Sequence, residues 1–452
     1  MSAQRKLFGL DAEARQKLVH AMRYAPDNAA SARQRDEGAH MPALRCASFD
    51  ALPGYKQLKI HQAVASQAGL EHPYYRCHEG LAKAVTVMEG RTYRNFATYD
   101  YLDLNGHPAI AAAVQEALAL YGTSASASRL TAGERPPHRA LETRLAKLYN
   151  VADCVAFVSG HAANMSTLGC LFGPHDAIFH DALSHNSLVQ GAILSGATRL
   201  AFPANDTLAL ERLLRERRRQ FQRAVIVSEG LFGMDGCLCP LPELVDLKRR
   251  FDCFLMVDEA HSLGVLGATG RGVYEHYSLA SDVVDIWMGT LSKTLCGCGG
   301  FIAGSSALVE LLKFSAPGFV YSVGMPPIMA AATAAAVDLM VAEPERVERL
   351  RERSAFLLNH ARELGLDTGR AQGFAVIPVM VGDSLSTAFL AQELRTQGVL
   401  AIPIIYPGVE EGQARLRFFA SAAHSEEDIR AALEATARLL PVARAKAASY
   451  VR

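Results

Sequence analysis

One lysine in the chain has a setting that a surface lysine does not need. Lys293 stands in "MGTLSKTLCGCGG", between a hydroxyl-rich turn and a cluster of glycines. The preceding "VDIWMG" is a short apolar run that is typical of a buried strand. A lysine at the mouth of a buried strand, with small residues around it, is typical of a side chain that bonds covalently to a bound molecule.

Carboxylates end two other apolar runs. Asp258 ends the run in "FLMVDEAHSLG", and His261 follows three residues later. Glu229 ends the run in "VSEGLFGMDG". A carboxylate at the end of a buried strand is costly unless a cationic group meets it, so Asp258 indicates a cationic partner. A helix-capping role is the alternative for Asp258.

Two helix starts add further polar groups. Gly160 and His161 follow the strand-like "CVAFVS" and open "GHAANMSTLG", where free backbone N–H groups would suit a phosphate. Alone this signal is weak, because many turns begin in this way. His185 stands at the head of a helix in "HDALSHNSLVQG". A lone histidine there is more often a cap or a core residue than a catalyst.

Together these groups match one cofactor, pyridoxal 5'-phosphate. This cofactor requires a lysine for covalent attachment and an acid that keeps its pyridine nitrogen protonated. It also requires a phosphate cradle and a flat group over its ring. Lys293, Asp258, the turn at Gly160 and His161, and His185 supply these four features.

Helical segments alternate with seven short apolar runs between about residues 110 and 340. The runs are "CVAFVS", "DAIFHD", "TRLAFP", "AVIVSEG", "FLMVDEA", "VDIWMGT" and "GGFIAG". This alternation predicts an α/β fold with a mostly parallel sheet that is covered by helices on both faces. Ligands of such sheets bind at the carboxyl ends of the strands, where the groups above lie.

The sequence predicts three parts: an N-terminal extension and arm over residues 1–105, a large cofactor-binding domain over 106–340, and a small α+β domain over 341–452. Helical periodicity marks residues 11–24 and 55–70, and residues 88–102 alternate like a hairpin. The alanine-rich stretch after Pro326 and the charged stretch from Glu343 predict helices. Strand-like "FAVIPVMVG", "LAIPIIYPG" and "ARLRFFAS" follow.

Composition is ordinary for a globular protein. Half of the 452 residues are apolar and the formal net charge is zero, which gives no support for binding to nucleic acid or to an anionic membrane. We see no apolar run of the ~20 residues that a membrane span requires. The N-terminus lacks the apolar core of a signal peptide, and nine cysteines without one predict reduced thiols in the cytoplasm. The pairs Cys296–Cys298 and Cys237–Cys239 lack further ligands at metal-site spacing, so we expect no metal.

The stretch "DEAHSLGVLGATGRG" followed by "GTLSKTLCGCGGFIAG" resembles the α-oxoamine synthases, which are fold-type I pyridoxal phosphate-dependent transferases. The resemblance runs from about Pro73 to the C-terminus and takes in "YDYLDLNGHP", "DALSHNSLVQG", "YSVGMPP" and "RLRFFASAAHSEEDI" in family order. It implies a large domain with a mostly parallel seven-stranded sheet and a small C-terminal α+β domain. "RCHEG", "SASR" and "GERPPH" are most similar to the synthases of polyketide and related natural-product assembly lines.

The resemblance assigns roles around the cofactor ring. Lys293 matches the attachment lysine and Asp258 the partner of the pyridine nitrogen. His185 matches the histidine stacked on the ring, and His261 the one that reaches the phenolic oxygen. Arg417 matches the residue that binds the substrate carboxylate, which a guanidinium can do in bidentate fashion.

Other matches concern the phosphate. Thr290 matches a phosphate-binding hydroxyl, and Gly160 and His161 match backbone contacts. Ser322 matches a hydroxyl supplied by the other subunit, which implies a homodimer with a shared active site. We also expect Glu229 to contribute to binding of the cofactor.

Some positions depart from the commoner family pattern. Gly233 replaces a frequent serine, so one hydrogen bond to the cofactor is expected to be missing or supplied by water. Tyr99 stands where many members have asparagine, and Val323 replaces a usual threonine. Arg415 is expected to be structural.

The activity implied is the decarboxylative condensation of a small amino acid with an acyl thioester. Glycine, alanine and serine stay open as the amino acid, and acyl carrier protein and coenzyme A as the acyl carrier. The alternatives are an aminotransferase, a non-catalytic partner subunit, or a plain binding module for carrier proteins. Residues 211–223 contain six arginines, which favour a solvated helix face over a docking site for an acidic carrier.

Overall fold

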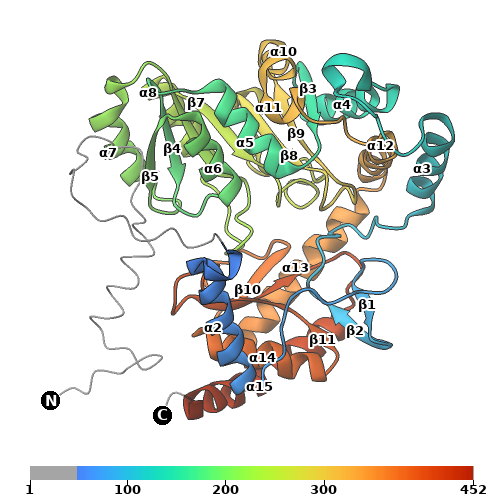
Figure 1. Cartoon of the computed structure of the whole chain (residues 1–452), viewed down its shortest axis with the longest axis vertical. Coiled ribbons are helices and arrows are strands. Elements are labelled where there is room, and N and C mark those ends of the chain that lie inside the picture. Colours follow the sequence, from blue (N-terminus) through green and yellow to red (C-terminus); the bar gives the residue numbers. More distant parts are fainter. Residues whose placement is uncertain (1–47, 451–452) are drawn as a thin grey trace. The chain divides into compact units, whose positions relative to one another are not determined.

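The computed structural model describes residues 48–450 (Figure 1). The chain divides into two units, and the larger one, Arg76–Leu440, contains every candidate site residue. The smaller unit includes helix α2 (Pro53–Gln67), which confirms the helix predicted over 55–70. The helix predicted over 11–24 lies outside the described residues.

A seven-stranded sheet forms the centre of the larger unit. Its strands lie in the order β3-β9-β8-β7-β6-β4-β5. Only β9 runs antiparallel to its neighbours, so the prediction of a mostly parallel sheet is confirmed. The strands are β3 (Asp153–Phe157), β4 (Ala177–Asp181), β5 (Thr198–Phe202), β6 (Ala224–Glu229), β7 (Phe254–Asp258), β8 (Ile286–Thr290) and β9 (Gly300–Gly304). Each corresponds to one of the seven predicted runs.

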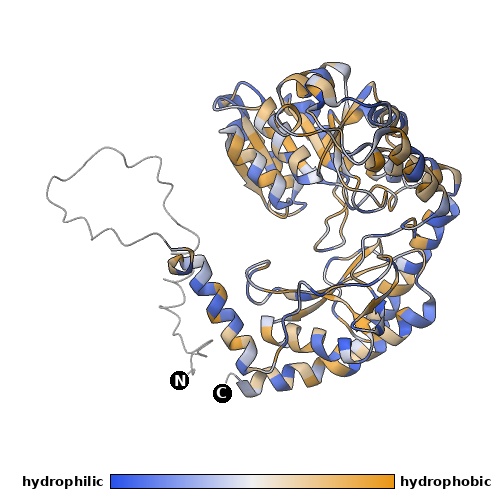
Figure 2. Ribbon diagram, turned by 45° about the vertical axis from the view of Figure 1, so that its right-hand side comes forward, coloured by the Kyte–Doolittle hydropathy of each residue, from blue (hydrophilic) through white to orange (hydrophobic). Residues whose placement is uncertain are grey.

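Apolar clusters with helices cover both faces of the sheet, so successive residues of a strand are buried in different clusters. Val225 and Val227 belong to one hydrophobic cluster, and Ala224 and Ile226, which alternate with them, belong to the other. Figure 2 shows these strands as mostly hydrophobic. The first cluster includes residues of α5 (Gly160–Leu171), α6 (Asn186–Ser195), α10 (Ser306–Ser315) and α11 (Pro317–Val320). The second includes residues of α3 (Pro108–Tyr121), α4 (Pro136–Leu148), α7 (Thr207–Arg217), α8 (Leu241–Phe251) and α12 (Pro327–Ala342).

A smaller antiparallel sheet follows, in the order β10-β13-β12. Its strands and helices are β10 (Val376–Gly382), β12 (Ile402–Ile404), β13 (Ala414–Phe419), α13 (Glu345–Glu363), α14 (Ser384–Thr396) and α15 (Glu426–Tyr450). The predicted hairpin is also present, as β1 (Val85–Met88) and β2 (Arg91–Asn95). Strand β2 pairs in parallel with β11 (Val399–Leu400), so the hairpin joins a sheet with the C-terminal part of the chain. The boundaries at 105 and 340 stay predictions.

No single helix of the described chain is both long and apolar enough to cross a membrane. Helices α12 and α13, bent by 80° at their junction, pass the criteria of length and composition only as a pair. Helix α12 packs against α3 and α4, as expected for a core helix.

Candidate active site

Lys293 follows the carboxyl end of β8, three residues after Thr290. Its side chain is partly buried, and burial lowers the pKa of the amine to about 8, against the opposing charges of Asp258 and Glu229. The amine lies 5.6 Å from the centre of the Tyr99 ring. A lysine that loses its proton near neutral pH is suited to act as a nucleophile or base.

Asp258 and Glu229 form a buried acidic pair at the ends of neighbouring strands. The two residues are direct register partners between β7 and β6. Burial raises the pKa of Glu229 to about 8, and the charge of Asp258 adds to the effect. The Asp258 carboxylate accepts hydrogen bonds from Ala260 N at 2.9 Å and Asn164 Nδ2 at 2.8 Å. Two adjacent buried acids require a cation, which a protonated ring nitrogen would supply alongside Lys293.

A chain of hydrogen bonds joins Asp258 to His185. Asn164 Nδ2 also donates to Ser187 Oγ at 2.9 Å, and Ser187 Oγ lies 2.7 Å from His185 Nδ1. The backbone N–H of Ser187 donates to the same Nδ1 at 3.3 Å, so His185 caps α6 as well as facing the site. The backbone N–H of His185 donates to Glu229 Oε1 at 2.6 Å. The structure therefore brings His185 and both acids together.

The sequence analysis missed Asn164 and Ser187. Asn164 lies inside α5, where asparagine is unfavourable unless its side chain has a partner. That mismatch between residue type and position was the available signal, but the partner, Asp258, is 94 residues away in the sequence. Asn164 Oδ1 is buried and has no hydrogen-bond partner among the described residues.

The start of α5 forms a cradle for an anion. Ser159 caps the helix by accepting from Ala162 N at 3.0 Å, which leaves the N–H groups of Gly160 and His161 at the helix start available. A Cβ atom on Gly160 would lie 3.2 Å from Thr290 Oγ1, so the Thr290 hydroxyl borders the same turn. A Cβ atom on Gly300 would come too close to Gly160, so β9 and the helix start require glycine at their closest approach. This geometry suits a phosphate group.

Arg417 extends from β13 toward the loop that follows β6. Its Nη1 donates to the carbonyl oxygen of Gly233 at 2.8 Å, and its Nη2 lies 3.4 Å from the Tyr99 hydroxyl. The buried Nε has no partner among the described residues, so this guanidinium keeps a free donor. Arg415 instead pairs with Asp235 at 2.6 Å, which supports the expected structural role.

Ser322 is the one predicted site residue that is not placed with the others. It lies between α11 and α12, and its hydroxyl donates to the carbonyl oxygen of Val323 at 3.2 Å. The prediction that Ser322 serves a second subunit stays a prediction, because the structure contains one chain.

A cavity of about 410 Å³ opens at Lys293. Polar side chains form much of its wall, and it also includes Cys296, whose thiol donates to Asp100 Oδ1 at 3.1 Å. Its polar lining residues are His78, Asn95, Thr98, Tyr99, Asp100, Asn105, Ser292 and Lys293.

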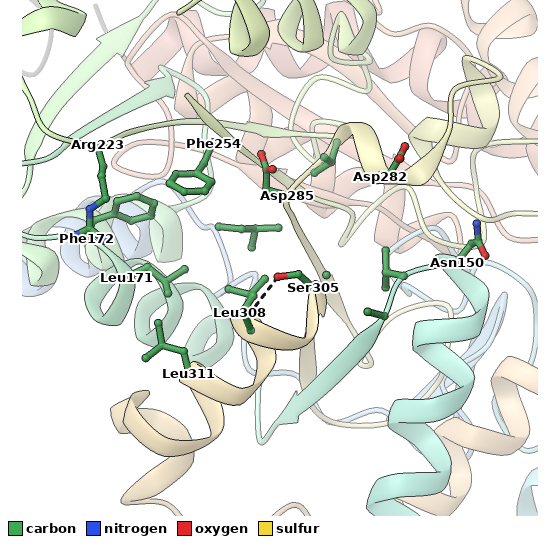
Figure 3. A pocket seen from close by; sticks show the side chains of 16 residues that line it. Asn150, Leu171, Phe172, Arg223, Phe254, Asp282, Asp285, Ser305, Leu308 and Leu311 are labelled. Atoms are coloured by element: carbon green, nitrogen blue, oxygen red, sulfur yellow. Dashed lines mark hydrogen bonds between the residues drawn. The ribbon is translucent and has the colours of Figure 1, made fainter. Parts of the chain in front are cut away.

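A second pocket, of about 540 Å³, lies at the opposite edge of the sheet. Its wall includes Phe254 at the start of β7 and Ile286 at the start of β8, whereas Lys293 follows the end of β8. Figure 3 shows Leu171, Phe172 and Phe254 gathered at one end of this pocket and Asp282 at the other. This pocket therefore has no part in the chemistry at Lys293.

The arginine-rich segment also lies at the edge of the sheet away from Lys293. It ends at Arg223, directly before the first residue of β6. Arg215 pairs with Glu211 at 2.5 Å, and Arg223 pairs with Asp176 at 2.7 Å. This position, away from Lys293, and these ion pairs favour a solvated helix face.

These features fit pyridoxal phosphate. Lys293 supplies the amine, and the Asp258–Glu229 pair can stabilise a protonated ring nitrogen. The start of α5 offers free N–H donors to a phosphate. The sheet and this site define a pyridoxal phosphate-dependent transferase of fold type I.

Comparison with known proteins identifies the family. The model of aminotransferase class I and II matches residues 91–435, and the chain belongs to this family. An 8-amino-7-oxononanoate synthase of Symbiobacterium thermophilum is 37% identical over 373 residues, which cover 82% of this chain and 94% of that protein. The same-named enzyme of Geobacter sulfurreducens is 41% identical over 355 residues, 78% of this chain and 90% of that protein.

Solved structures agree. Serine palmitoyltransferase of Sphingomonas wittichii superposes with a TM-score of 0.84 at 26% identity, over 88% of this chain and 100% of that one. A structure of SPT with pyridoxal phosphate gives a TM-score of 0.83 at 25% identity, over 87% and 99%. Within the larger family the chain is a pyridoxal phosphate-dependent α-oxoamine synthase.

Proposed function

We propose that the enzyme condenses a small amino acid with an acyl thioester and releases carbon dioxide, a free thiol and an α-aminoketone. The observation that carries the proposal is the Lys293 amine, whose pKa is about 8, beside the Asp258–Glu229 pair and next to a cavity. Pyridoxal phosphate supplies the electron sink when it is bound, because its protonated ring nitrogen stabilises negative charge at the amino acid Cα.

The chain's own residues have separate tasks. Lys293 would anchor the cofactor, and its free amine would take the Cα proton of the amino acid. Arg417 binds the carboxylate of the amino acid through its free Nε and its Nη2. Asp258 would hold a proton on the ring nitrogen, and His185 would cover the face of the ring.

The bond changes balance without an external oxidant. A carbon–carbon bond forms between the amino acid Cα and the acyl carbonyl carbon, and the carbon–sulfur bond of the thioester breaks. The thiol leaves with a proton. The amino acid carboxylate then leaves as carbon dioxide, and a proton takes its place on Cα.

The cavity at Lys293 is the proposed route for the acyl thioester. Its volume of about 410 Å³ lies within the usual range of small-molecule sites. Glycine, alanine and serine remain the candidates for the amino acid, since one small group at Cα separates them.

We further propose an acyl carrier protein as the donor of the acyl group, with coenzyme A as the alternative. The proposal rests on the motifs "RCHEG", "SASR" and "GERPPH". The 4-hydroxy-2,2'-bipyrrole-5-methanol synthase PigH of Serratia sp. is 36% identical over 339 residues. The match covers 75% of this chain and 52% of that protein.

The proposed functional unit is a homodimer in which Ser322 of each subunit contributes to the phosphate site of the other. Ser322 is half-buried between the exposed side chains of Tyr321 and Val323, in a segment that a partner could cover. A homodimer would place this segment beside the cradle at Gly160 of the other subunit.

The test is an assay of purified enzyme with each amino acid and an acyl thioester, carried by coenzyme A or by a carrier protein. We expect carbon dioxide and free thiol in equal amounts. An aminotransferase would instead form a keto acid without carbon dioxide, and a non-catalytic subunit would form neither. Either result would reject the proposal.

A further inference from the structure

Tyr101 and His261 form a buried pair beside the proposed cofactor site. The Tyr101 hydroxyl lies 2.8 Å from Nδ1 of His261. Tyr101 has no exposed surface, and His261 is 9% exposed. Tyr101 lies in the segment between β2 and α3, and His261 in the turn after β7, so the pair joins two segments that are 160 residues apart.

The Tyr101 hydroxyl is the donor in this bond. Within the described chain it has no acceptor other than His261 Nδ1, and a buried hydroxyl proton without an acceptor is costly. Burial raises the pKa of Tyr101 well above its usual value and lowers the pKa of His261 well below its own. The phenol therefore keeps its proton and the imidazole is neutral. A neutral imidazole that accepts at Nδ1 carries its proton on Nε2.

His261 Nε2 lies over Gly233, in the loop that follows β6. A Cβ atom on Gly233 would overlap both Nε2 and Cδ2 of His261. The ring is held on its other side by the 2.8 Å hydrogen bond from Tyr101, and it lies parallel to Phe419 and edge-on to Tyr99, with ring centres 6.2 Å and 6.1 Å apart. Only glycine at position 233 leaves the histidine in this place.

We propose that Tyr101 is a positioning residue that fixes His261 as an Nε2–H donor toward the cofactor, and that Gly233 provides the space for that ring. The inference rests on the proposed function, in which His261 reaches the phenolic oxygen of the cofactor. The family resemblance leads one to expect a serine hydroxyl at position 233. In this chain position 233 has no hydroxyl, so the imidazole N–H of His261 is the side-chain donor left for the phenolic oxygen at this place.

The test is the visible absorbance of the substrate-free holoenzyme as a function of pH. A hydrogen-bond donor to the phenolic oxygen stabilises the oxygen's anionic form, so it lowers the pH at which the lysine–cofactor linkage loses its proton. Tyr101→Phe should therefore raise the midpoint of the spectral change by about half to one pH unit. Lys293, Arg417 and His185 also face His261, and they are unchanged in this variant.

Tyr149→Phe is the matched control. Tyr149 is also fully buried, but its hydroxyl has no hydrogen-bond partner among the described residues, so its loss should leave the midpoint unchanged. An unchanged midpoint in Tyr101→Phe as well would overturn the proposal.

Gly233→Ala is a second and independent variant, for the case that Tyr101→Phe does not fold. Its methyl group should displace His261 and raise the midpoint in the same direction, and the double variant should show less than the sum of both shifts. Gly173→Ala is its control, because a Cβ atom there meets nothing within 4 Å. An unchanged midpoint in Gly233→Ala would contradict the proposal.

The test needs no substrate, so it separates two kinds of failure. Variants that show the midpoint shifts, together with a wild-type enzyme that releases no carbon dioxide, would refute the proposed function and leave the Tyr101–His261 inference standing. An active enzyme whose variants show no shift would do the reverse.

Discussion

The side-chain amide of Asn164 donates a hydrogen bond of 2.8 Å to the buried carboxylate of Asp258. The same nitrogen donates to Ser187 Oγ, which lies 2.7 Å from Nδ1 of His185. One hydrogen-bonded chain therefore sets the orientation of the acid proposed to meet the ring nitrogen and of the histidine proposed to stack on the ring. Neither residue could move without disturbing the other.

Replacing Asn164 by alanine should uncouple this chain. Asp258 would lose its side-chain donor, and a hydrogen bond to a charged group contributes about 1.5–3 kcal/mol, so we expect kcat/KM to fall about 10- to 100-fold. The cofactor should also dissociate faster, which dialysis followed by absorbance would measure. Thr167→Val is the control, since Thr167 lies one turn further along α5 and its buried hydroxyl has no partner in the described chain. Equal losses in both variants would show that Asn164 contributes only to packing.

Reloading of the apoenzyme with pyridoxal phosphate should depend on the pKa of Lys293. Only the unprotonated amine is a nucleophile, so the rate should rise about tenfold per pH unit below pH 8 and level off above it. The growth of the visible band at each pH measures the rate. An unperturbed lysine would give a rise that continues to about pH 10.4.

Glu229→Gln provides the check on that interpretation. Glu229, whose own pKa is about 8, carries part of its charge near the start of the plateau, and that charge raises the pKa of Lys293, so its removal should move the start of the plateau slightly to lower pH. A plateau that moves upward would mean that another group controls reloading.

The two arginines of β13 should differ in what they affect. Arg417→Lys should raise the KM for the amino acid about 10- to 100-fold with little change in thermal unfolding, because lysine cannot reproduce the bidentate contact. Arg415→Ala should lower the free energy of unfolding by about 1.5–3 kcal/mol, since it leaves the carboxylate of Asp235 with the half-exposed Arg370, 3.6 Å away, in place of its buried partner. Kinetics and denaturant unfolding of both variants would test this division, and a reversal of the two effects would contradict it.

The shared active site predicts complementation between two defective variants. Lys293→Ala removes the anchor, and Ser322→Ala removes the hydroxyl proposed to reach across to the partner. In a mixed dimer one site would combine Lys293 from one subunit with Ser322 from the other. Random mixing should therefore restore about a quarter of the tight cofactor sites of the wild type. If each site is built from one chain alone, every site keeps one of the two defects, and mixing would restore no tight site.

The sequence predicted all seven strands of the large sheet because each is a short apolar run that ends in polar or glycine residues. Lys293, Asp258 and Glu229 were recognised because each stands at or just after the end of such a run. The structure places all three at strand ends on one edge of the sheet. Asn164, Ser187 and Tyr101 were not assigned to the site, because their roles depend on partners that only the folded chain brings near.

Two further features could not be predicted from local sequence patterns alone. The hairpin of β1 and β2 pairs with β11, about 300 residues later, and no periodicity indicates that contact. Ser322 was proposed from resemblance, and its assignment requires a second chain.

The most direct test of the account is to reduce the holoenzyme with borohydride, digest it and locate the cofactor by mass spectrometry. Reduction makes the lysine–cofactor bond permanent. The account predicts the cofactor mass on the peptide that carries Lys293, and none in Lys293→Ala. Cofactor on a different lysine, or an enzyme that binds none, would contradict the assignment of Lys293 and the mechanism built on it.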